Sequence, residues 1–293
     1  MEQHYWWLFA LLQPVGFAFS TLVNQIYKKP GSAVVSLRST LVLLALLPFT
    51  FFVEMPSQPI FYIASFTAAI LAFIADSLIM NSSAKFGAGT TSRILPMAPL
   101  GGFILWLIVH PESFYKFLDY PVISAAIVLS LLTCSYAISH LQRCDISKKA
   151  LIYLLPVIVC FSINDVMNKT AQDNSGLMSG VVWYTFFLSI ISILSGTLVQ
   201  IKNKTLLASL KDKDLLKAGF FVGIFYFIAI MGRNLSMVYT ENPAYTSIIA
   251  GGAPLILFVY HKIFNIEDKA NVKAGLLFTA GVLSLIFFAS YIK

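Results

Sequence analysis

The sequence predicts an all-α integral membrane protein with ten transmembrane helices, arranged as two inverted five-helix repeats. Three observations lead to this fold class. The composition is too apolar for a water-soluble domain of 293 residues, with 58% hydrophobic residues, 11% charged residues and a mean hydropathy of +0.81. Apolar runs of roughly 20 residues, the length that crosses a hydrocarbon core, recur along the chain. The second half also repeats features of the first half in the same order.

The apolar runs define the predicted spans. In chain order we expect helices over Tyr5–Tyr27, Val34–Val53, Pro59–Ser82, Gly89–Val109, Pro121–Leu141, Lys149–Thr170, Gly176–Gln200, Leu215–Tyr239, Pro243–Phe264 and Val272–Tyr291. The first run lacks a positively charged flank and a small-residue cleavage site, so we interpret it as a span and not as a secretory signal. The connections are mostly short, which makes neighbouring helices antiparallel. The longest connection, Ile201–Asp214, is basic and polar and is predicted to be a loop.

Two pairs of similar stretches suggest an internal repeat. They are Asp76–Leu100 with Ile230–Leu257, and Pro14–Lys28 with Pro156–Lys169. In the first pair, a shift of 155 places Pro99 on Pro254, and each stretch combines a charged apolar arm with a tight corner. Because five spans are an odd number, a second copy must enter the membrane in the opposite sense. We therefore predict two repeats, residues 1–146 and 147–293.

The distribution of lysine and arginine predicts the orientation. The connections after the odd-numbered spans carry 14 of these residues, and the opposite side, including both termini, carries 3. Positive residues stay on the cytoplasmic side, so both termini are expected outside. The net charge of +7 is then a topology signal, and no basic patch of the kind that binds nucleic acid accompanies it.

Three arginines and two aspartates fall inside predicted spans, where a charge is costly and usually faces a partner or a water-filled cavity. Arg38, Asp76 and Arg93 lie toward the basic side of the membrane, and Asp165 and Arg233 lie toward the other side. This division predicts two half-sites, Arg38 and Arg93 with Asp76, and Arg233 with Asp165. Two alternatives stay open: structural ion pairs that fix helix register, and side chains that reach the interface from the ends of spans.

Uncharged side chains extend the predicted substrate-binding site. The additional candidates are Asn24, Asn164, Asn168, Ser247, Tyr245, Trp183 and Tyr184. The amides and hydroxyls either line a polar pathway or serve as hydrogen bonds between helices. The two adjacent aromatic rings either stack on a ligand or anchor their helix at the lipid interface.

Enzyme chemistry finds little support in the sequence. The three cysteines show no CxxC or metal-binding spacing and are interpreted as apolar packing residues. The four histidines are scattered, and no phosphate-binding glycine loop, HExxH motif or Ser-His-Asp set is visible. We therefore expect no catalytic residues, no metal and no cofactor.

The layout of ten short-looped spans, with paired Ala-Pro helices in the fourth and ninth positions, resembles the drug/metabolite transporter superfamily, in particular its EamA-type members. The resemblance covers essentially the whole chain through diffuse motifs. It implies inverted five-helix repeats around a central cavity that moves amino acids, nucleotide-sugars, choline-like amines or other metabolites. Many bacterial members are understood to keep both termini in the cytoplasm, and the lysine placement here predicts the reverse.

The resulting functional hypothesis is a secondary transporter in the cell (inner or plasma) membrane. Its expected partners are the lipid bilayer and a small-molecule substrate, with amino acids or related zwitterions favoured because both charge signs are present in each half-site. One alternative is an anionic, phosphate-bearing metabolite such as a nucleotide or sugar phosphate, because arginine suits phosphate. A membrane-embedded lipid-handling enzyme or scaffold is an alternative of another class. Coupling to protons or to exchange, and a monomeric or homodimeric state, stay open.

Overall fold

The computed structural model describes residues 5–95, 97–141, 148–264 and 271–291, and the chain is all-α throughout these ranges. Within them, ten helical segments are long and apolar enough to cross a membrane. Each overlaps one of the predicted spans, so the protein is a multi-pass membrane protein with the predicted number of spans among its described residues. The predicted boundary between the halves, at residues 146/147, lies outside the described ranges.

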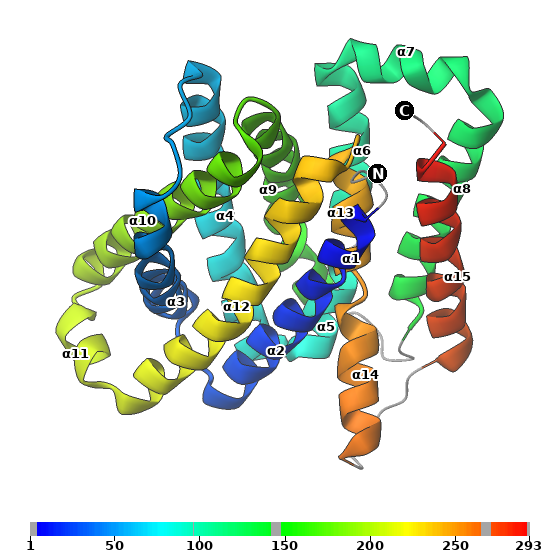
Figure 1. The fold of residues 1–293 in the computed structure, drawn as a ribbon. Coiled ribbons are helices and arrows are strands. Elements are labelled where there is room, and N and C mark those ends of the chain that lie inside the picture. Colours follow the sequence, from blue (N-terminus) through cyan, green and yellow to red (C-terminus); the bar gives the residue numbers. More distant parts are fainter. Residues whose placement is uncertain (1–4, 96, 142–147, 265–270, 292–293) are drawn as a thin grey trace.

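The spans follow one another in chain order (Figure 1). The first five consist of α1 (Trp6–Ala10) with α2 (Leu12–Tyr27), α3 (Gly31–Leu46) with the 3₁₀ turn η2 (Leu47–Phe51), α4 (Pro59–Phe86), α5 (Ala88–Ile94) with α6 (Met97–Val109), and α8 (Pro121–Ser139). The second five consist of α9 (Lys148–Asp173), α10 (Leu177–Lys202), α12 (Lys213–Tyr239), α13 (Pro243–Ala250) with α14 (Ala253–Ile263), and α15 (Val272–Ala289).

Two short helices lie in connections between the predicted spans. The prediction of a loop over Ile201–Asp214 is wrong, because this segment contains the end of α10, the helix α11 (Leu206–Lys211) and the start of α12. The Asp212 side chain caps α12 by accepting hydrogen bonds from the backbone N–H groups of residues 214 and 215, each 3.0 Å long. In the other connection, α7 (Pro111–Asp119) begins with a proline at its first position and carries Glu112 in its first turn, both favourable at a helix start.

The fourth and ninth spans are each broken in the middle. Between α13 and α14, tight turns at Gly251 and Gly252 interrupt the helix, with backbone hydrogen bonds of 3.0 and 2.9 Å to residues 248 and 249. Pro254 has no N–H to donate to the Ala250 carbonyl, so regular hydrogen bonding cannot continue through this point. Such breaks inside a membrane bundle are tolerated where protein or a polar cavity surrounds the backbone.

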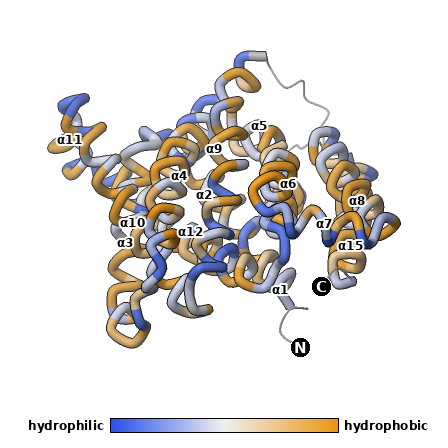
Figure 2. Tube along the Cα trace, turned by 90° about the horizontal axis from the view of Figure 1, so that it is seen from above, coloured by the Kyte–Doolittle hydropathy of each residue, from blue (hydrophilic) through white to orange (hydrophobic). Residues whose placement is uncertain are grey.

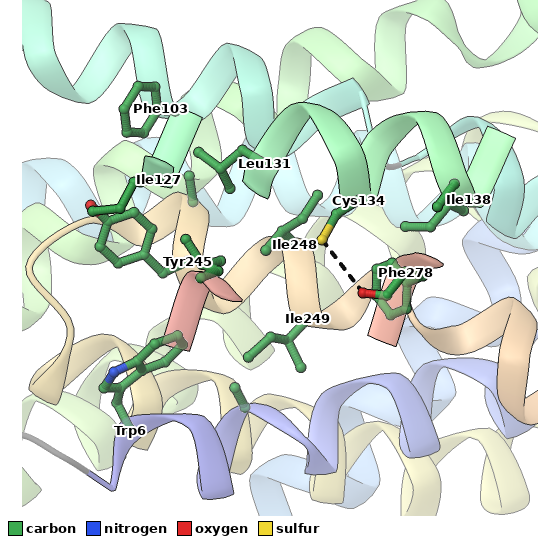
Figure 3. Packing of buried hydrophobic residues seen from close by; sticks show 14 residues of the cluster. Trp6, Phe103, Ile127, Leu131, Cys134, Ile138, Tyr245, Ile248, Ile249 and Phe278 are labelled. Carbon is green, nitrogen blue, oxygen red and sulfur yellow. Dashed lines mark hydrogen bonds between the residues drawn. The ribbon is translucent and has the colours of Figure 1, made fainter. Parts of the chain in front are cut away.

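Four extensive helix pairings organise the bundle: α4 with α9, α2 with α12, α3 with α10, and α8 with α15. The last pair stands at one side of the bundle, with α7 running across from the end of α6 to the start of α8 (Figure 1). Figure 3 shows the packing at this pair. Cys134 of α8 lies against Phe278 of α15, and its thiol donates to the Phe278 carbonyl at 3.8 Å. Around them, buried apolar side chains of α1, α6 and α13 form one cluster.

The surface of the bundle is suited to lipid. Figure 2 shows apolar residues along most of each span and hydrophilic residues at α11 and other helix ends. Large apolar side chains point outward from several spans, such as Val122 at 80%, Ile152 at 71% and Ile63 at 67% exposure. A water-soluble protein rarely exposes so much contiguous apolar surface, and a hydrocarbon core stabilises it.

Candidate functional site

The first buried ion pair joins α3 to α4. A terminal nitrogen of Arg38 donates to the Asp76 carboxylate, and both residues are buried, at 2% and 8% exposure. The Arg38 guanidinium also lies over the ring of Tyr226 on α12, 3.6 Å from the ring centroid. This distance is well within the range of a cation–π interaction. The pairing of Arg38 with Asp76 that the sequence predicted is therefore confirmed, and the aromatic partner is new.

The second buried ion pair joins α9 to α12. A terminal nitrogen of Arg233 donates to Asp165, as predicted, and the same nitrogen donates to Asn164 Oδ1 at 2.7 Å. Asn164 in turn donates from Nδ2 to the carbonyl of Ala68 on α4 at 2.7 Å. Arg233 is thus held by two neighbouring residues of α9, and a further hydrogen bond connects this set to the first five spans.

The two ion pairs face adjoining cavities in the middle of the bundle. We call them the Asp165 cavity, with a volume of about 80 Å³, and the Asp76 cavity, with a volume of about 60 Å³. They share the lining residues Gln13, Phe17, Phe161 and Arg233. Since a buried water needs roughly 10–15 Å³ of such space, each cavity has room for several waters or a small polar ligand group.

The Asp165 cavity lies where the interrupted spans meet α9 and α12. Its remaining lining comes from α5 and α6 (Ser92, Ala98, Pro99), the residue between them (Leu95), α9 (Asp165), α13 (Ser247, Ala250) and the break before α14 (Gly251). The remaining lining of the Asp76 cavity comes from α2 (Ser20), α3 (Arg38), α4 (Ala72, Asp76, Met80) and α12 (Tyr226, Ala229, Ile230). Residues from both predicted halves therefore contribute to each cavity.

Several polar atoms at the cavities lack a hydrogen-bond partner among the described residues. They are Gln13 Oε1, Ser20 Oγ and the Nε atoms of Arg38 and Arg233. Leaving such groups buried and unpaired costs about 1–3 kcal/mol each, and more when the group is charged. Bound water or a ligand with both donors and acceptors would remove this cost. The arrangement therefore offers binding capacity that the ion pairs do not use.

The predicted polar candidates divide between the cavities and the helix interfaces. Ser247 lines the Asp165 cavity. Asn164 does not line it, but accepts a hydrogen bond from Arg233, which does. Asn24 instead donates from Nδ2 to the Met80 carbonyl at 2.7 Å, which ties α2 to α4. Asn168 donates to Asn234 of α12 at 3.0 Å. These last two amides serve as hydrogen bonds between helices, the second interpretation that the sequence left open.

None of the three predicted aromatic candidates lines either cavity. The indole N–H of Trp183 donates to the Val53 carbonyl at 3.1 Å, near the end of its span. Tyr184 is fully buried, with its ring among apolar residues such as Phe61 and its hydroxyl beside Asn164 and near Arg233. Tyr245 packs against Trp6, with ring centroids 6.1 Å apart.

Arg93, the fifth predicted charge, lies on α5, which also contributes Ser92 to the Asp165 cavity; its side chain lies outside the described part of the structure.

Three aromatic residues that line the cavities were not among the predicted candidates. Phe17 and Phe161 lie in both linings, and Tyr226 lies in that of the Asp76 cavity beneath Arg38. Phe161 lies in Pro156–Lys169, the stretch that resembles Pro14–Lys28 of the first span. The internal repeat could therefore have identified it as a candidate. Tyr226 sits in an aromatic-rich part of α12, and nothing in its local pattern distinguishes it from lipid-facing neighbours such as Phe220 and Phe221.

A peripheral ion pair connects the segment between α2 and α3 to the start of α12. Lys29, between α2 and α3, donates to Asp212 Oδ2 at 2.8 Å and to Oδ1 at 3.1 Å. This hydrogen bond, together with those from the backbone at the start of α12, lowers the pKa of the Asp212 carboxyl. Elsewhere in the described ranges, three or more His, Cys, Asp or Glu side chains do not gather into a metal-binding group.

Comparison with known proteins gives no further assignment. No family model matches the sequence, and a search of the curated proteins finds no match.

Proposed function

We propose that this protein is a secondary transporter of the EamA type within the drug/metabolite transporter superfamily. Its substrate would be a small zwitterionic metabolite, best matched by an amino acid, and alternating access would occur around the central cavities. The observation that carries the proposal is the pair of buried Arg–Asp contacts facing adjoining cavities inside the membrane bundle. Buried charges in transmembrane helices typically mark substrate or ion pathways.

The free capacity of the two ion pairs favours a zwitterion. Arg38 and Arg233 each bond their aspartate through one terminal nitrogen, and their Nε atoms have no partner among the described residues. A carboxylate bound there gains charge-assisted hydrogen bonds. Asp76 and Asp165 supply the opposite charge for an ammonium group. A ligand with one net charge would instead disturb the balance of two arginines and two aspartates at the described cavity walls, which costs desolvation energy.

The helix pairings are consistent with an inverted repeat. If spans one to five correspond to spans six to ten, the contact of α4 with α9 has its counterpart in that of α12 with α2. The same operation relates the contact of α3 with α12 to that of α10 with α4. The pairs of α3 with α10 and α8 with α15 then join counterpart to counterpart. This pattern supports halves of residues 1–146 and 147–293, with substrate bound at their interface.

The remaining features of the proposal follow from the sequence. The cell (inner or plasma) membrane is the proposed location, with both termini outside because of the lysine distribution. Proton coupling or exchange would involve Asp76 and Asp165, the carboxylates at the cavities.

Reconstituted transport tests the proposal directly. Proteoliposomes loaded with a mixture of unlabelled amino acids should accumulate a labelled amino acid by exchange, or take it up down its gradient. Asp165→Asn and Arg233→Gln should abolish this uptake. Lys169→Gln is the matched control, because Lys169 is a buried cation on the same helix that pairs with Asp173 and lines neither described cavity. Uptake of sugar phosphates or nucleotides in preference to every amino acid would favour the anionic alternative and refute the zwitterion.

A further inference from the structure

A second polar pocket lies at the end of the bundle beneath α7, separate from the central cavities. It is formed by α6, α7, the turn between α12 and α13, and the first residues of α13. Two of its lining residues, Trp106 and Asn242, are each only 3% exposed. The interior volume is about 20 Å³, enough for one or two water-sized groups. A ligand can therefore insert one small polar group, and the rest of it must stay outside.

The interior of the pocket offers hydrogen-bond donors without partners. Trp106 Nε1 and Asn242 Nδ2 are buried and make no hydrogen bond within the described ranges. The amide orientation of Asn242 is fixed, because its Oδ1 caps α13 by accepting from the Ala244 N–H at 2.9 Å. Both free groups can only donate. The inserted group must therefore be an acceptor.

The mouth of the pocket carries one charge of each sign. Lys116 of α7 and Glu241 lie 3.8 Å apart, Nζ to Oε2, and their side chains are 47% and 44% exposed. A pair so long and so exposed contributes little stability and separates at low cost. Lys116 adds a cation beside the buried donors, and Glu241 adds an acceptor for an amine. A ligand that links an oxyanion to an ammonium group matches these features, with the oxyanion at the donors and Lys116 and the ammonium group at Glu241.

The surroundings of the pocket fit a lipid. The pocket lies at the ends of α6 and α12, the level at which headgroups meet a spanning helix. On α6, Ile104 and Ile108 are 58% and 67% exposed and lie one helical turn apart, so they form an apolar strip on the outer face of the helix, opposite Trp106. On α7, Tyr115 and Leu118 are 65% and 57% exposed. Both helices that form the pocket therefore face lipid on their outer sides.

We propose that the pocket beneath α7 binds the headgroup of a zwitterionic phospholipid. One phosphate oxygen accepts hydrogen bonds from Trp106 Nε1 and Asn242 Nδ2, with Lys116 beside it. The ammonium group lies against Glu241, and the acyl chains extend from the pocket mouth into the bilayer. The site shares no residue with the central cavities. A bound lipid at this point connects α7 to the turn between α12 and α13.

The test measures lipid retention and thermal stability of the delipidated full-length protein. Phosphatidylethanolamine should raise the Tm of the wild-type protein and survive as a bound adduct in native mass spectrometry. Trp106→Phe removes one donor and keeps an aromatic ring. Asn242→Asp keeps the cap of α13 and replaces the donor by a carboxylate. Each variant should bind the lipid about tenfold more weakly or worse, since a hydrogen bond to a charged group is lost.

The matched control is Asn271→Asp. Asn271 caps α15 through a contact of 3.4 Å from the Ala274 N–H and does not line the pocket. This variant introduces the same charge change at another helix start, and it should bind lipid as the wild-type protein does.

Four results would overturn the proposal. Equal lipid binding by the wild-type protein and both pocket variants would show that the donors do not hold the headgroup. Failure of the wild-type protein to bind any phospholipid would leave water as the occupant. Equal protection by inorganic phosphate or phosphoethanolamine would identify a soluble ligand. Stronger binding of phosphatidylglycerol than of phosphatidylethanolamine would remove the role of Glu241.

Discussion

Removing one member of the Arg233–Asp165 pair should destabilise the protein more than removing both. In Arg233→Met the Asp165 carboxylate stays buried at 3% exposure and loses the ion-pair partner it has among the described residues. In Asp165→Leu the buried Arg233 guanidinium loses its carboxylate partner in the same way. In the double variant both charges are replaced by apolar groups of similar size. Buried ion pairs respond to such replacements with small net changes, because the desolvation cost disappears together with the attraction.

The expected magnitude comes from the contacts of Arg233. Its terminal nitrogen donates to Asp165 and to Asn164, and hydrogen bonds to charged groups contribute about 1.5–3 kcal/mol each. Their sum, about 3–6 kcal/mol, agrees with the roughly 3–5 kcal/mol lost when one partner of a buried pair is removed. The two side chains are 9% and 4% exposed, so solvent screens the pair little. The double variant should lose about 2 kcal/mol or less.

Reversible unfolding in mixed detergent micelles measures these free energies as a double-mutant cycle. The control is Lys169→Met on the same helix, whose partner Asp173 is 38% exposed at the i+4 position. Water can solvate the carboxylate left behind, so this loss should be smaller than that of Arg233→Met. Additive losses in the double variant would refute the coupling of Arg233 with Asp165. Transport should be absent in all three cavity variants, since stability restored in the double variant does not restore the charges that we propose bind substrate.

Three further predictions follow. Tyr226→Leu should destabilise the protein by about 1–2 kcal/mol through loss of the cation–π contact with Arg38 at 3.6 Å, and Tyr226→Phe should retain most of that stability in the same unfolding assay. The folded-state pKa of Asp212 lies below the unfolded value of about 3.9, so its stabilising pair with Lys29 is present at neutral pH. The stability difference between wild type and Asp212→Ala should therefore shrink as the pH falls below about 4. A reporter that fluoresces only in the cytoplasm should stay dark when fused after Lys293, and a bright fusion would contradict the orientation taken from the lysine distribution.

The spans and the ion pairs were predictable because both depend on strong and local energetic rules. Every apolar run of the required length became a helix, since a bilayer leaves unpaired backbone groups no other solution. Charges inside such runs must find partners, and each described arginine in a span is paired with the aspartate assigned to it from the sequence, Arg38 with Asp76 and Arg233 with Asp165. Depth along a span and sign of charge were sufficient to match them.

The direction in which an uncharged side chain points was not predictable in the same way. Trp183 and Tyr184 are neighbours on α10, yet one bonds a backbone carbonyl near the helix end and the other is fully buried, with its hydroxyl beside Asn164. Their orientation depends on the neighbours that α10 acquires in the bundle, which no single-sequence pattern contains. The same reason explains Tyr226, whose importance depends on Arg38, a residue 188 positions earlier in the chain. The short helices α7 and α11 were missed because, at 9 and 6 residues, they are far below the length of the apolar runs from which the spans were predicted.

The placement of the two ion pairs has a consequence for the proposed transport cycle. Arg38 and Asp76 both belong to the first proposed half, and Arg233 and Asp165 both belong to the second. Rocking one half against the other therefore leaves each ion pair intact and avoids the several kcal/mol that separating buried charges would cost. The polar contacts that cross between the halves at this level are of a weaker kind. They include the stacking of Arg38 on Tyr226 and the hydrogen bond from Asn164 to the Ala68 carbonyl. Breaking them costs about 1–2 kcal/mol each, an amount that substrate binding at the shared cavity wall can offset.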